Sequence, residues 1–417
     1  MDMSRPGRHG MTHVIVMNRW KDHYADYARY IDHTRCTVSY VTSPAGRASV
    51  PEGAAEIVTL ENIEDLAQLR AAVLGLAERH GRPDRLITLK EEDLENAALL
   101  RTELGLPGQR PQEVPVFRDK VVMVGRIAAA GLPAPAFAAV SSAAEVVAFA
   151  AEHGWDLMVK PRSGSGSAGV VRVSGPQELA EVDFDRWPMM VQVRNPHPVC
   201  HVDGVFDGEK LVVWRGSRYL NSCFDFAQGT FLGSVEQGDP ELHRIIGDST
   251  EQFMRALTDQ PTPFHLELFL EQSESGTTCS FLEVGGRVGG SETPFLWREV
   301  HGYDLMEAAF HIQLGVAPTG GVDWDTEDIA GWLLLPAPAE RPCRITAVRS
   351  MTDRTPGPYA EALLAPGDIL PVAHGYEHVG GRFRFRASSA AELTEAIMAT
   401  YLDFTVSAVP VGTGDGA

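Results

Sequence analysis

Two runs typical of strands, Phe264-His-Leu-Glu-Leu-Phe-Leu270 and Cys279-Ser-Phe-Leu-Glu-Val284, decide the interpretation of this sequence. The segment between them contains serines and a glycine, which is typical of a turn. A hairpin centred near Ser275 places Glu267 opposite Glu283. Directly opposed residues have Cβ atoms about 5 Å apart, and like charges in this position destabilise a hairpin. Because hard cations such as Mg²⁺ bind carboxylate oxygens, the pair predicts a divalent-metal site, with two solvated glutamates as the alternative.

The composition is that of a globular protein of several domains. The chain has 417 residues, of which 44% are hydrophobic and 22% charged, so two or three domains are expected. Its net charge of −20 comes from 56 acidic and 36 basic residues. With no polybasic run and no apolar run of 18 residues, neither nucleic acid nor a membrane is expected as a partner.

The start of the chain and its cysteines indicate a cytoplasmic protein. The first ten residues have no apolar core of the kind found in secretory signals, and we expect them to form a disordered extension. The five cysteines are odd in number and widely spread, without the spacing of metal ligands or of a disulfide framework. This pattern favours a reducing compartment.

Strand and helix signals alternate in the first quarter of the chain. His13–Met17 and Thr37–Val41 are short apolar runs suited to buried parallel strands, and Leu66–His80 has helical spacing that ends at Gly81. This βαβ rhythm predicts a parallel sheet with flanking helices. The last hundred residues mix strand signals with a helix over Ala390–Tyr401, which predicts a small α+β unit.

A glycine-rich loop, Gly164-Ser-Gly-Ser-Ala-Gly169, matches a dinucleotide-binding pattern but lies in the wrong context. That pattern must open a helix, whereas Val170–Val173 here is strand material. The protein-kinase pattern also matches locally, but its downstream lysine and catalytic loop are absent. A strand–loop–strand flap can still cover a phosphate, since glycines let main-chain N–H groups approach phosphate oxygens. A flexible surface hairpin is the alternative.

Two lysines strengthen the phosphate interpretation. Lys160 ends the strand that leads into the loop, where it can act as a point charge on a phosphate. Lys120 starts a predicted helix over Asp119–Ala130, a position that the helix dipole disfavours for a cation unless an anion lies nearby. Arg287 lies four residues after Glu283 and therefore shares its face if the strand stays extended. Its fork of donors suits a carboxylate or an oxyanion, with a structural ion pair as the alternative.

The order of these segments resembles the ATP-grasp superfamily, over about residues 115 to 315. The matching segments are Arg118-Asp-Lys120, Ala130-Gly-Leu-Pro133, Val159-Lys-Pro161 with the glycine flap, Met190-Val-Gln192, His201-Val-Asp-Gly204, Phe264-His-Leu-Glu267 and Phe281-Leu-Glu-Val-Gly-Gly-Arg287 with Gly289-Gly290. Within the superfamily, Glu-Val-Gly-Gly-Arg resembles the carboxylate–amine ligases, particularly the L-amino acid (dipeptide) ligases.

The resemblance implies a mixed α/β and α+β fold of four parts. These are an N-terminal parallel-sheet α/β domain (12–112), an ATP-grasp lid subdomain (113–195), a catalytic subdomain (196–318) and a C-terminal α+β subdomain (319–417). The implied enzyme is an ATP-dependent ligase that activates a carboxylate as an acyl phosphate and joins it to an amine. An amino acid is the expected substrate, and ADP and phosphate are the other products. A homodimer is common in similar enzymes.

The resemblance also assigns roles to individual residues. Glu267 and Glu283 would bind one or two Mg²⁺ ions, or Mn²⁺, and act in catalysis together with Arg287. Residues implied in ATP binding are Lys120, Lys160, Ser163, Gly164, Ser165, Gly166, Ser167, Gly169, Gln192 and Val193. Residues implied in substrate binding are His201, His265, Gly290, Trp297 and His301, although a hydrogen-bonded structural role is the alternative for the histidines.

Two positions depart from the family pattern and leave alternatives open. Gly285 stands where many ATP-grasp enzymes have an asparagine that binds metal, and Pro198 lies where an acid often binds ribose. The chain could therefore be an ATP-grasp enzyme that acts on bicarbonate or a nucleotide precursor, or a nucleotide-binding module without catalysis. A basic cluster in the pocket would favour a nucleotide precursor.

Overall fold

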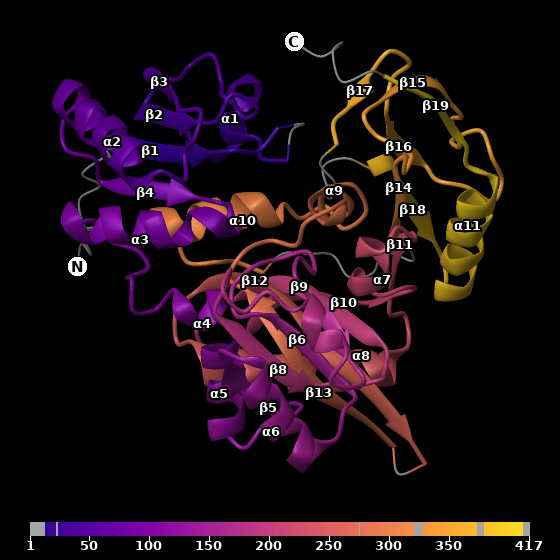
Figure 1. Cartoon of the computed structure of the whole chain (residues 1–417). Coiled ribbons are helices and arrows are strands. Elements are labelled where there is room, and N and C mark those ends of the chain that lie inside the picture. Colours follow the sequence, from indigo (N-terminus) through magenta and orange to yellow (C-terminus); the bar gives the residue numbers. More distant parts are fainter. Residues whose placement is uncertain (1–12, 22–23, 275, 321–327, 373–378, 412–417) are drawn as a thin grey trace, which may run out of the picture.

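The computed structural model describes residues 13–21, 24–274, 276–320, 328–372 and 379–411 (Figure 1). The expected disordered extension of the first ten residues and the hairpin centre at Ser275 lie outside these ranges. Among the described residues, no helix combines the length and the apolar character that crossing a membrane requires. The chain forms an α/β and α+β structure with one parallel sheet and three antiparallel sheets.

The N-terminal unit is the predicted parallel sheet with flanking helices. Its strands follow the order β3-β2-β1-β4, and buried apolar residues lie on both faces of the sheet. Its elements are β1 (His13–Asn18), α1 (Tyr27–Tyr30), β2 (Thr37–Thr42), β3 (Glu56–Thr59), α2 (Leu66–His80), β4 (Arg85–Thr88) and α3 (Leu94–Glu103), with 3₁₀ turns at Arg47–Ser49 and Glu91–Asp93. Helix α2 has the predicted bounds, with Asp65 accepting hydrogen bonds from the main chain of its first turn.

A four-stranded antiparallel sheet, in the order β5-β8-β6-β7, forms the second unit. Its elements are α4 (Pro115–Arg118), α5 (Lys120–Ala129), β5 (Phe137–Val140), α6 (Ala143–His153), β6 (Leu157–Pro161), β7 (Val171–Val173), a 3₁₀ turn (Glu178–Glu181) and β8 (Met189–Val193). The glycine loop joins β6 to β7, as the strand signals on both sides of it predict.

The largest sheet has eight antiparallel strands in the order β13-β12-β9-β10-β11-β14-β18-β16. Its strands are β9 (Val199–Phe206), β10 (Leu211–Tyr219), β11 (Leu232–Glu236), β12 (Thr262–Ser273), β13 (Gly276–Gly285), β14 (Ile329–Pro336), β16 (Ala360–Leu363) and β18 (Val379–Ala387). The helices of this part of the chain are α7 (Cys223–Ala227), α8 (Pro240–Leu257), α9 (Thr293–Glu299), α10 (Leu305–Leu314) and α11 (Ala390–Asp403). A small sheet of β17 (Ile369–Leu370), β15 (Cys343–Val348) and β19 (Val406–Pro410) follows.

One face of the eight-stranded sheet is covered by helices and the other is polar near its centre. Helices α5 and α8 pack on β9, β12 and β13 through residues such as Phe253 and Leu266, and α11 packs on β14 and β18. Because side chains alternate along a strand, the intervening residues point to the opposite face. His201 and Asp203 of β9, and His265 and Glu267 of β12, therefore share that face.

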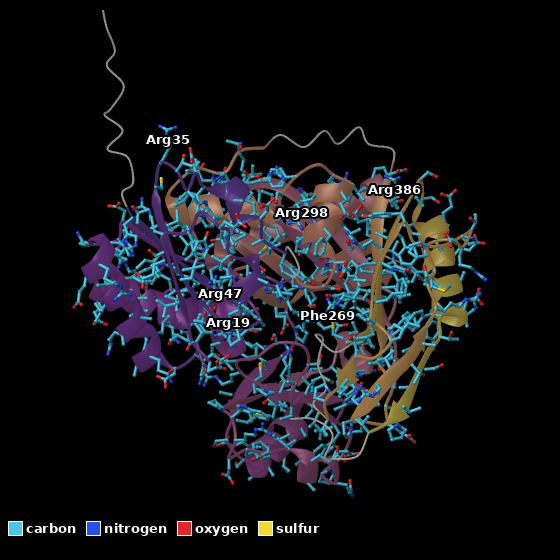
Figure 2. The ribbon with its side chains drawn as sticks, turned by 90° about the horizontal axis from the view of Figure 1, so that it is seen from above. Arg19, Arg35, Arg47, Phe269, Arg298 and Arg386 are labelled. Carbon is cyan, nitrogen blue, oxygen red and sulfur yellow. The ribbon has the colours of Figure 1, made fainter. Side chains whose placement is uncertain are left out.

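Two views place the N-terminal unit (indigo) and the C-terminal strands (yellow) on opposite sides of the molecule, with the central segments between them (Figures 1 and 2). The eight-stranded sheet extends across the predicted boundary at residue 318. Strands β14, β16 and β18 follow this residue and join the strands that precede it. Helix α10 packs against the N-terminal unit through Phe310. The four predicted domain ranges stay a prediction.

Candidate active site

The hairpin of β12 and β13 pairs Glu267 with Glu283, so the predicted pairing is confirmed. The pairing depends on a bulge that the sequence did not reveal. Toward the turn, Ser273 pairs with Gly276 and Leu268 with Phe281, a register that would place Leu282 opposite Glu267. One extra residue between Phe281 and Glu283 shifts the register and brings the second glutamate into place.

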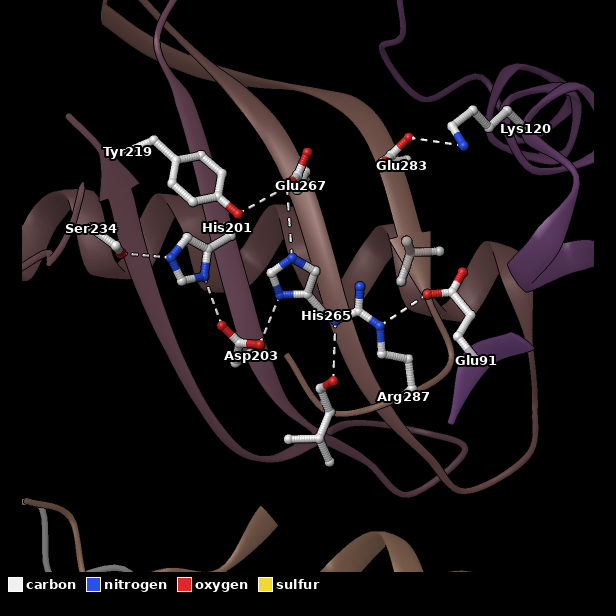
Figure 3. Close-up of polar contacts among 12 residues, drawn as sticks. Glu91, Lys120, His201, Asp203, Tyr219, Ser234, His265, Glu267, Glu283 and Arg287 are labelled. Atoms are coloured by element: carbon white, nitrogen blue, oxygen red, sulfur yellow. Dashed lines mark hydrogen bonds and ion pairs between the residues drawn. The ribbon is translucent and has the colours of Figure 1, made fainter. Parts of the chain in front are cut away.

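The carboxylate of Glu267 is held through one of its two oxygens (Figure 3). Tyr219 donates a hydrogen bond of 3.0 Å from its hydroxyl to Glu267 Oε1, and His265 Nε2 lies 3.6 Å from the same oxygen. Both contacts therefore leave Oε2 to other partners. The side chain of Glu267 is 13% exposed, and that of Glu283 is 33% exposed, so both can reach a ligand in the cavity.

Behind Glu267 lies a buried network of two histidines and an aspartate (Figure 3). Asp203 accepts hydrogen bonds from His201 Nδ1 at 2.7 Å and from His265 Nδ1 at 2.8 Å. Burial alone would lower the pKa of His265, but the carboxylates of Asp203 and Glu267 raise it to about 9. Burial would raise the pKa of Asp203, yet His265 and His201 hold it well below its usual range. The two carboxylates therefore favour the protonated form of the His265 imidazole, which lies directly behind Glu267.

The two histidines predicted as substrate contacts differ in their access to the cavity. His201 is 3% exposed and uses its second nitrogen on Ser234 Oγ, 2.7 Å away, whereas His265 lines the cavity. The geometry of His201 agrees with the structural alternative. His265 has a structural partner in Asp203 on one side and faces Glu267 on the other.

Lys120 and the glycine loop lie beside Glu283. Asp119 caps α5 by accepting hydrogen bonds from the main chain of Val121 and Val122, which fixes Lys120 at the start of the helix. Lys120 Nζ lies 3.4 Å from Glu283 Oε2 and donates a 2.9 Å hydrogen bond to the main-chain oxygen of Gly164. The cation is therefore within reach of both the predicted metal ligand and the loop.

The glycine loop needs its glycines for its conformation. Gly164 and Gly166 have φ values of 133° and 64°, a region that other residues rarely adopt. Residues 164–168 line the cavity, while Ser163 and Gly169 do not. Lys160 is 7% exposed on β6 and is not a lining residue. Burial lowers its pKa to about 8, an effect that Glu283 opposes.

The cavity has a volume of about 1260 Å³ and is lined by loops that follow the N-terminal strands, by the glycine loop and by one face of the eight-stranded sheet. The predicted site residues that line the cavity, together with the glycine loop, are Glu267, Glu283, Lys120, Arg287, His265 and Gly290. The residues Gln192, Val193, Trp297 and His301 do not line it. Gln192 is 2% exposed, and its Nε2 has no hydrogen-bond partner among the described residues. An orphaned buried amide of this kind fits a ligand contact, so the adenine role stays a prediction.

Trp297 and His301 are core residues in this structure, not lining residues. Trp297 is 2% exposed within the apolar cluster that joins α10 to the N-terminal unit. His301 is 4% exposed, and its Nε2 is 2.7 Å from Glu236 Oε1. Their position after the Gly-rich turn predicted contact with substrate, but the ring of Trp297 on α9 and the ring of His301, two residues after that helix, are both buried.

Arg287 forms an ion pair, the alternative considered for it, but its partner is Glu91, which the sequence did not indicate (Figure 3). Its Nε donates to Glu91 Oε2 at 2.9 Å, and the other oxygen of Glu91 accepts from Arg118 Nη1 at 2.7 Å. Burial would raise the pKa of Glu91, but Arg287 and Arg118 lower it. A Cβ built on Gly285 would lie 3.3 Å from Arg287 Nε and 3.4 Å from Glu91 Oε2, so this ion pair crowds the space beside residue 285.

Glu91 follows the carboxyl end of β4, and this position was the available signal. Parallel α/β sheets place their functional groups at that end of the strands. Other lining residues of the same unit are Arg19, Lys21 and Lys90. Arg19 is already paired with Glu64 at 2.6 Å and with Asp93.

Comparisons with known proteins agree with this geometry. No protein-family model matches the chain. An L-arginine-specific L-amino acid ligase of Bacillus subtilis is 22% identical over 329 residues, which are 76% of either chain. An uncharacterized protein, y4rH, of Sinorhizobium fredii is 41% identical over 223 residues, which are 51% of this chain and 44% of that protein.

Two solved structures share the fold along nearly the whole chain. The L-amino acid ligase from Bacillus licheniformis has a TM-score of 0.74 and 19% identity, and the match covers 96% of this chain and 99% of that one. The N5-carboxyaminoimidazole ribonucleotide synthetase from Thermotoga maritima has a TM-score of 0.66 and 14% identity, with 95% and 99% covered. The chain therefore shares the fold of these two enzymes along nearly its whole length.

Proposed function

We propose that this chain is an ATP-dependent ligase of the ATP-grasp superfamily, which activates a carboxylate with ATP and joins it to an amine. An amino acid is the substrate class that we propose. The observation that carries the proposal is the pairing of Glu267 with Glu283 on one wall of the cavity, beside Lys120. Opposed carboxylates next to a lysine suit a metal–triphosphate complex.

The residues fit Mg²⁺ by the chemistry of their donor atoms. Glu267 and Glu283 offer hard carboxylate oxygens from neighbouring strands, and Tyr219 holds one oxygen of Glu267 so that the other is oriented. When bound, the ion would neutralise charge on the phosphates. Gly285 adds no oxygen from a side chain, so we propose a centre in which these two glutamates are the side-chain ligands of one or two Mg²⁺ or Mn²⁺ ions.

The other residues would bind and orient the phosphates and the acyl group. Lys120 and Lys160 would hold phosphate oxygens, and main-chain N–H groups of the glycine loop would cover them. A substrate carboxylate oxygen attacks the γ-phosphorus and releases ADP, which gives an acyl phosphate. The amine nitrogen then attacks the acyl carbon, loses a proton and displaces phosphate. Arg287, which donates a hydrogen bond to Glu91, would stabilise the oxyanion of that step.

The direct test is the release of ADP and phosphate when the purified protein receives ATP, Mg²⁺ and pairs of amino acids. We expect release that depends on both partners, together with a new amide detected by mass spectrometry. Release without any new amide, or none with a broad panel of carboxylates and amines, contradicts the proposal.

A bicarbonate or nucleotide-precursor substrate is the second candidate. The observation that favours it is a group of cations on the cavity wall, including Lys21, Lys90 and Arg341. Neighbouring acids reduce this charge, however, since Arg382 lies 3.7 Å from Glu292. Bicarbonate-dependent ADP release without an amine would support this candidate over the first.

We also propose that the partners are small molecules and that the protein works in the cytoplasm. The expected homodimer stays a prediction, which light scattering on the purified protein would test.

A further inference from the structure

The cavity has an apolar wall that none of the charged residues above explains. We use this name for Tyr219, Cys223, Phe226, Leu232, Trp332 and Val379, all of which line the cavity and belong to one contiguous cluster. The cluster is continuous because Tyr219 pairs with Ser234, which in turn pairs with Trp332 across β10, β11 and β14. Paired residues of antiparallel strands share a face, so this wall lies on the face that does not pack against α11.

The strand order separates the apolar wall from the predicted phosphate site. Glu283 lies on β13 at the edge of the sheet, where Lys120 and the glycine loop are also found. The wall begins at Tyr219, which contacts Glu267, and extends through β11 and β14 toward β18. With about 4.8 Å between neighbouring strands, β14 is about 19 Å from β12, on the side away from β13. The Tyr219 end of the wall is therefore next to Glu267, and a ligand there does not occupy the space of the triphosphate.

The chemistry of the wall and of its border selects a class of ligand. Three aromatic rings and three smaller apolar groups suit a large apolar side chain rather than a charged one. At the β18 end, Arg341 and Arg382 also line the cavity. Alternation along β18 explains why Arg382 faces the cavity while Phe383 packs under α11. When an amide forms between two amino acids, the amine substrate keeps its own carboxylate. Arginine is well suited to bind it, although Arg382 shares its charge with Glu292, 3.7 Å away.

We propose that the apolar wall binds the side chain of the amine substrate, which is an aromatic or large aliphatic α-amino acid. The inference rests on the proposed function and makes it narrower, because it assigns this side chain to a wall and its carboxylate to the arginine border. The predicted acyl phosphate lies on the Glu267 side. The amine nitrogen would therefore lie between the acyl phosphate and the apolar wall.

The first experiment measures binding to the wild-type protein, with Mg²⁺ and ADP present, by isothermal titration calorimetry. We expect L-phenylalanine and L-leucine to bind at least about 10-fold more tightly than L-aspartate, L-lysine or glycine, a factor that an apolar pocket can supply. L-phenylalaninamide, which lacks the carboxylate, should bind more weakly than L-phenylalanine. Equal or tighter binding of the charged amino acids overturns the proposal.

The second experiment compares two variants from the same cluster. Phe226→Ala removes a ring that lines the cavity, whereas Leu334→Ala removes a buried side chain that does not line it. We expect Phe226→Ala to raise the Kd of L-phenylalanine about 10-fold with the Kd of ADP unchanged. Leu334→Ala should leave both values unchanged in the folded protein, as checked by circular dichroism. Equal effects of the two variants contradict a direct contact.

The third experiment separates this inference from the proposed function. In a ligation with ¹⁵N-labelled L-phenylalanine, the label should appear in the new amide nitrogen. If the labelled residue instead supplies the carbonyl group, the protein is a ligase but the assignment to the amine substrate is wrong. If charged amino acids are ligated and apolar ones are not, the ligase function stands and the inference fails. If L-phenylalanine binds but only bicarbonate supports ADP release, the proposed function fails instead.

Discussion

The eight-stranded sheet has one face on the cavity, and the two ends of that face hold their side chains by different interactions. At the β13 end, Glu267, Glu283 and Lys120 are charged and held by specific contacts of 3.0 to 3.6 Å. At the β18 end, Leu232 and Trp332 form a surface by apolar packing. Hydrogen bonds fix direction, while apolar contact is tolerant of shape. One scaffold thus combines a site that must be rigid with a surface that can be varied.

The largest effect should come from the charged end. Glu267→Gln removes a charge that we propose to bind metal. We expect turnover to fall by at least about 10³-fold, because the loss of one oxyanion donor already lowers kcat by about 10²- to 10³-fold. Nucleotide binding should persist in part. Steady-state ADP release and calorimetry with ADP measure the two quantities. Glu271→Gln is the matched control, because Glu271 lies on the same strand but bonds Asn195 outside the cavity.

Arg287 should show the next largest effect. Arg287→Lys keeps the positive charge but loses the fork that contacts Glu91, so we expect a fall in kcat of about 10²- to 10³-fold. Pre-steady-state phosphate release would show whether the loss lies in amide formation. Arg126→Lys, on the solvent-facing part of α5, should be close to wild type. A loss seen only in KM would place Arg287 in substrate binding rather than in the chemical step.

The buried network behind Glu267 should have a smaller effect, which would sharpen the comparison. Asp203→Asn leaves His265 without its anionic partner, so we expect the Mg²⁺ concentration for half-maximal activity to rise about 10- to 100-fold. The activity at saturating Mg²⁺ should recover to a large extent. Asp207→Asn, in the turn after β9, is the control. An unchanged requirement for Mg²⁺ would show that the network serves only the fold.

Lys160 should produce the smallest effect, one visible in proton exchange. Its pKa is lowered to about 8 mainly by burial, so part of the lysine is neutral at pH 8.5. A phosphate favours the charged ammonium and raises this pKa, hence ATP binding at pH 8.5 should take up a proton. Calorimetry in two buffers of different ionisation enthalpy measures the uptake, and Lys160→Arg should abolish it. Uptake that persists in this variant would assign the proton to another group.

The same shift fixes the sign of a stability change. Since the pKa of Lys160 is lower in the folded chain than its ordinary value of 10.5, unfolding takes up a proton between about pH 8 and 10.5. The contribution of this lysine to stability therefore rises with pH across that window.

Local sequence patterns predict much of the fold and of the charged end of the cavity. Helix α2 and the strands around the glycine loop follow from periodicity and turn chemistry within a few residues. The bulge at Leu282 could not be predicted in this way, because a hairpin with or without it has the same local signals. The agreement between the predicted and observed glutamate pair thus depends on a feature that only the three-dimensional register shows.

The missed features are those that come from distant segments. Glu91 contacts residues 27 and 196 positions away, and the apolar wall draws on four strands and α7. Helix α8 was also missed, although Ile246, Phe253 and Met254 give it a clear buried face. For Trp297 and His301, the position after a glycine turn led to the prediction of a substrate contact, but such a position does not reveal that both rings are buried in this structure.

The contact between Glu91 and Arg287 has a consequence for how the protein becomes active in a cell. The two residues are separated by 196 positions, and synthesis at about 5 to 20 residues per second makes the second one about 10 to 40 s after the first. Through most of that interval Glu91 can contact Arg118, while the second of its two arginines has not yet been made. Competence for the reaction is thus acquired late in biogenesis, as a property of the whole polypeptide rather than of any piece of it.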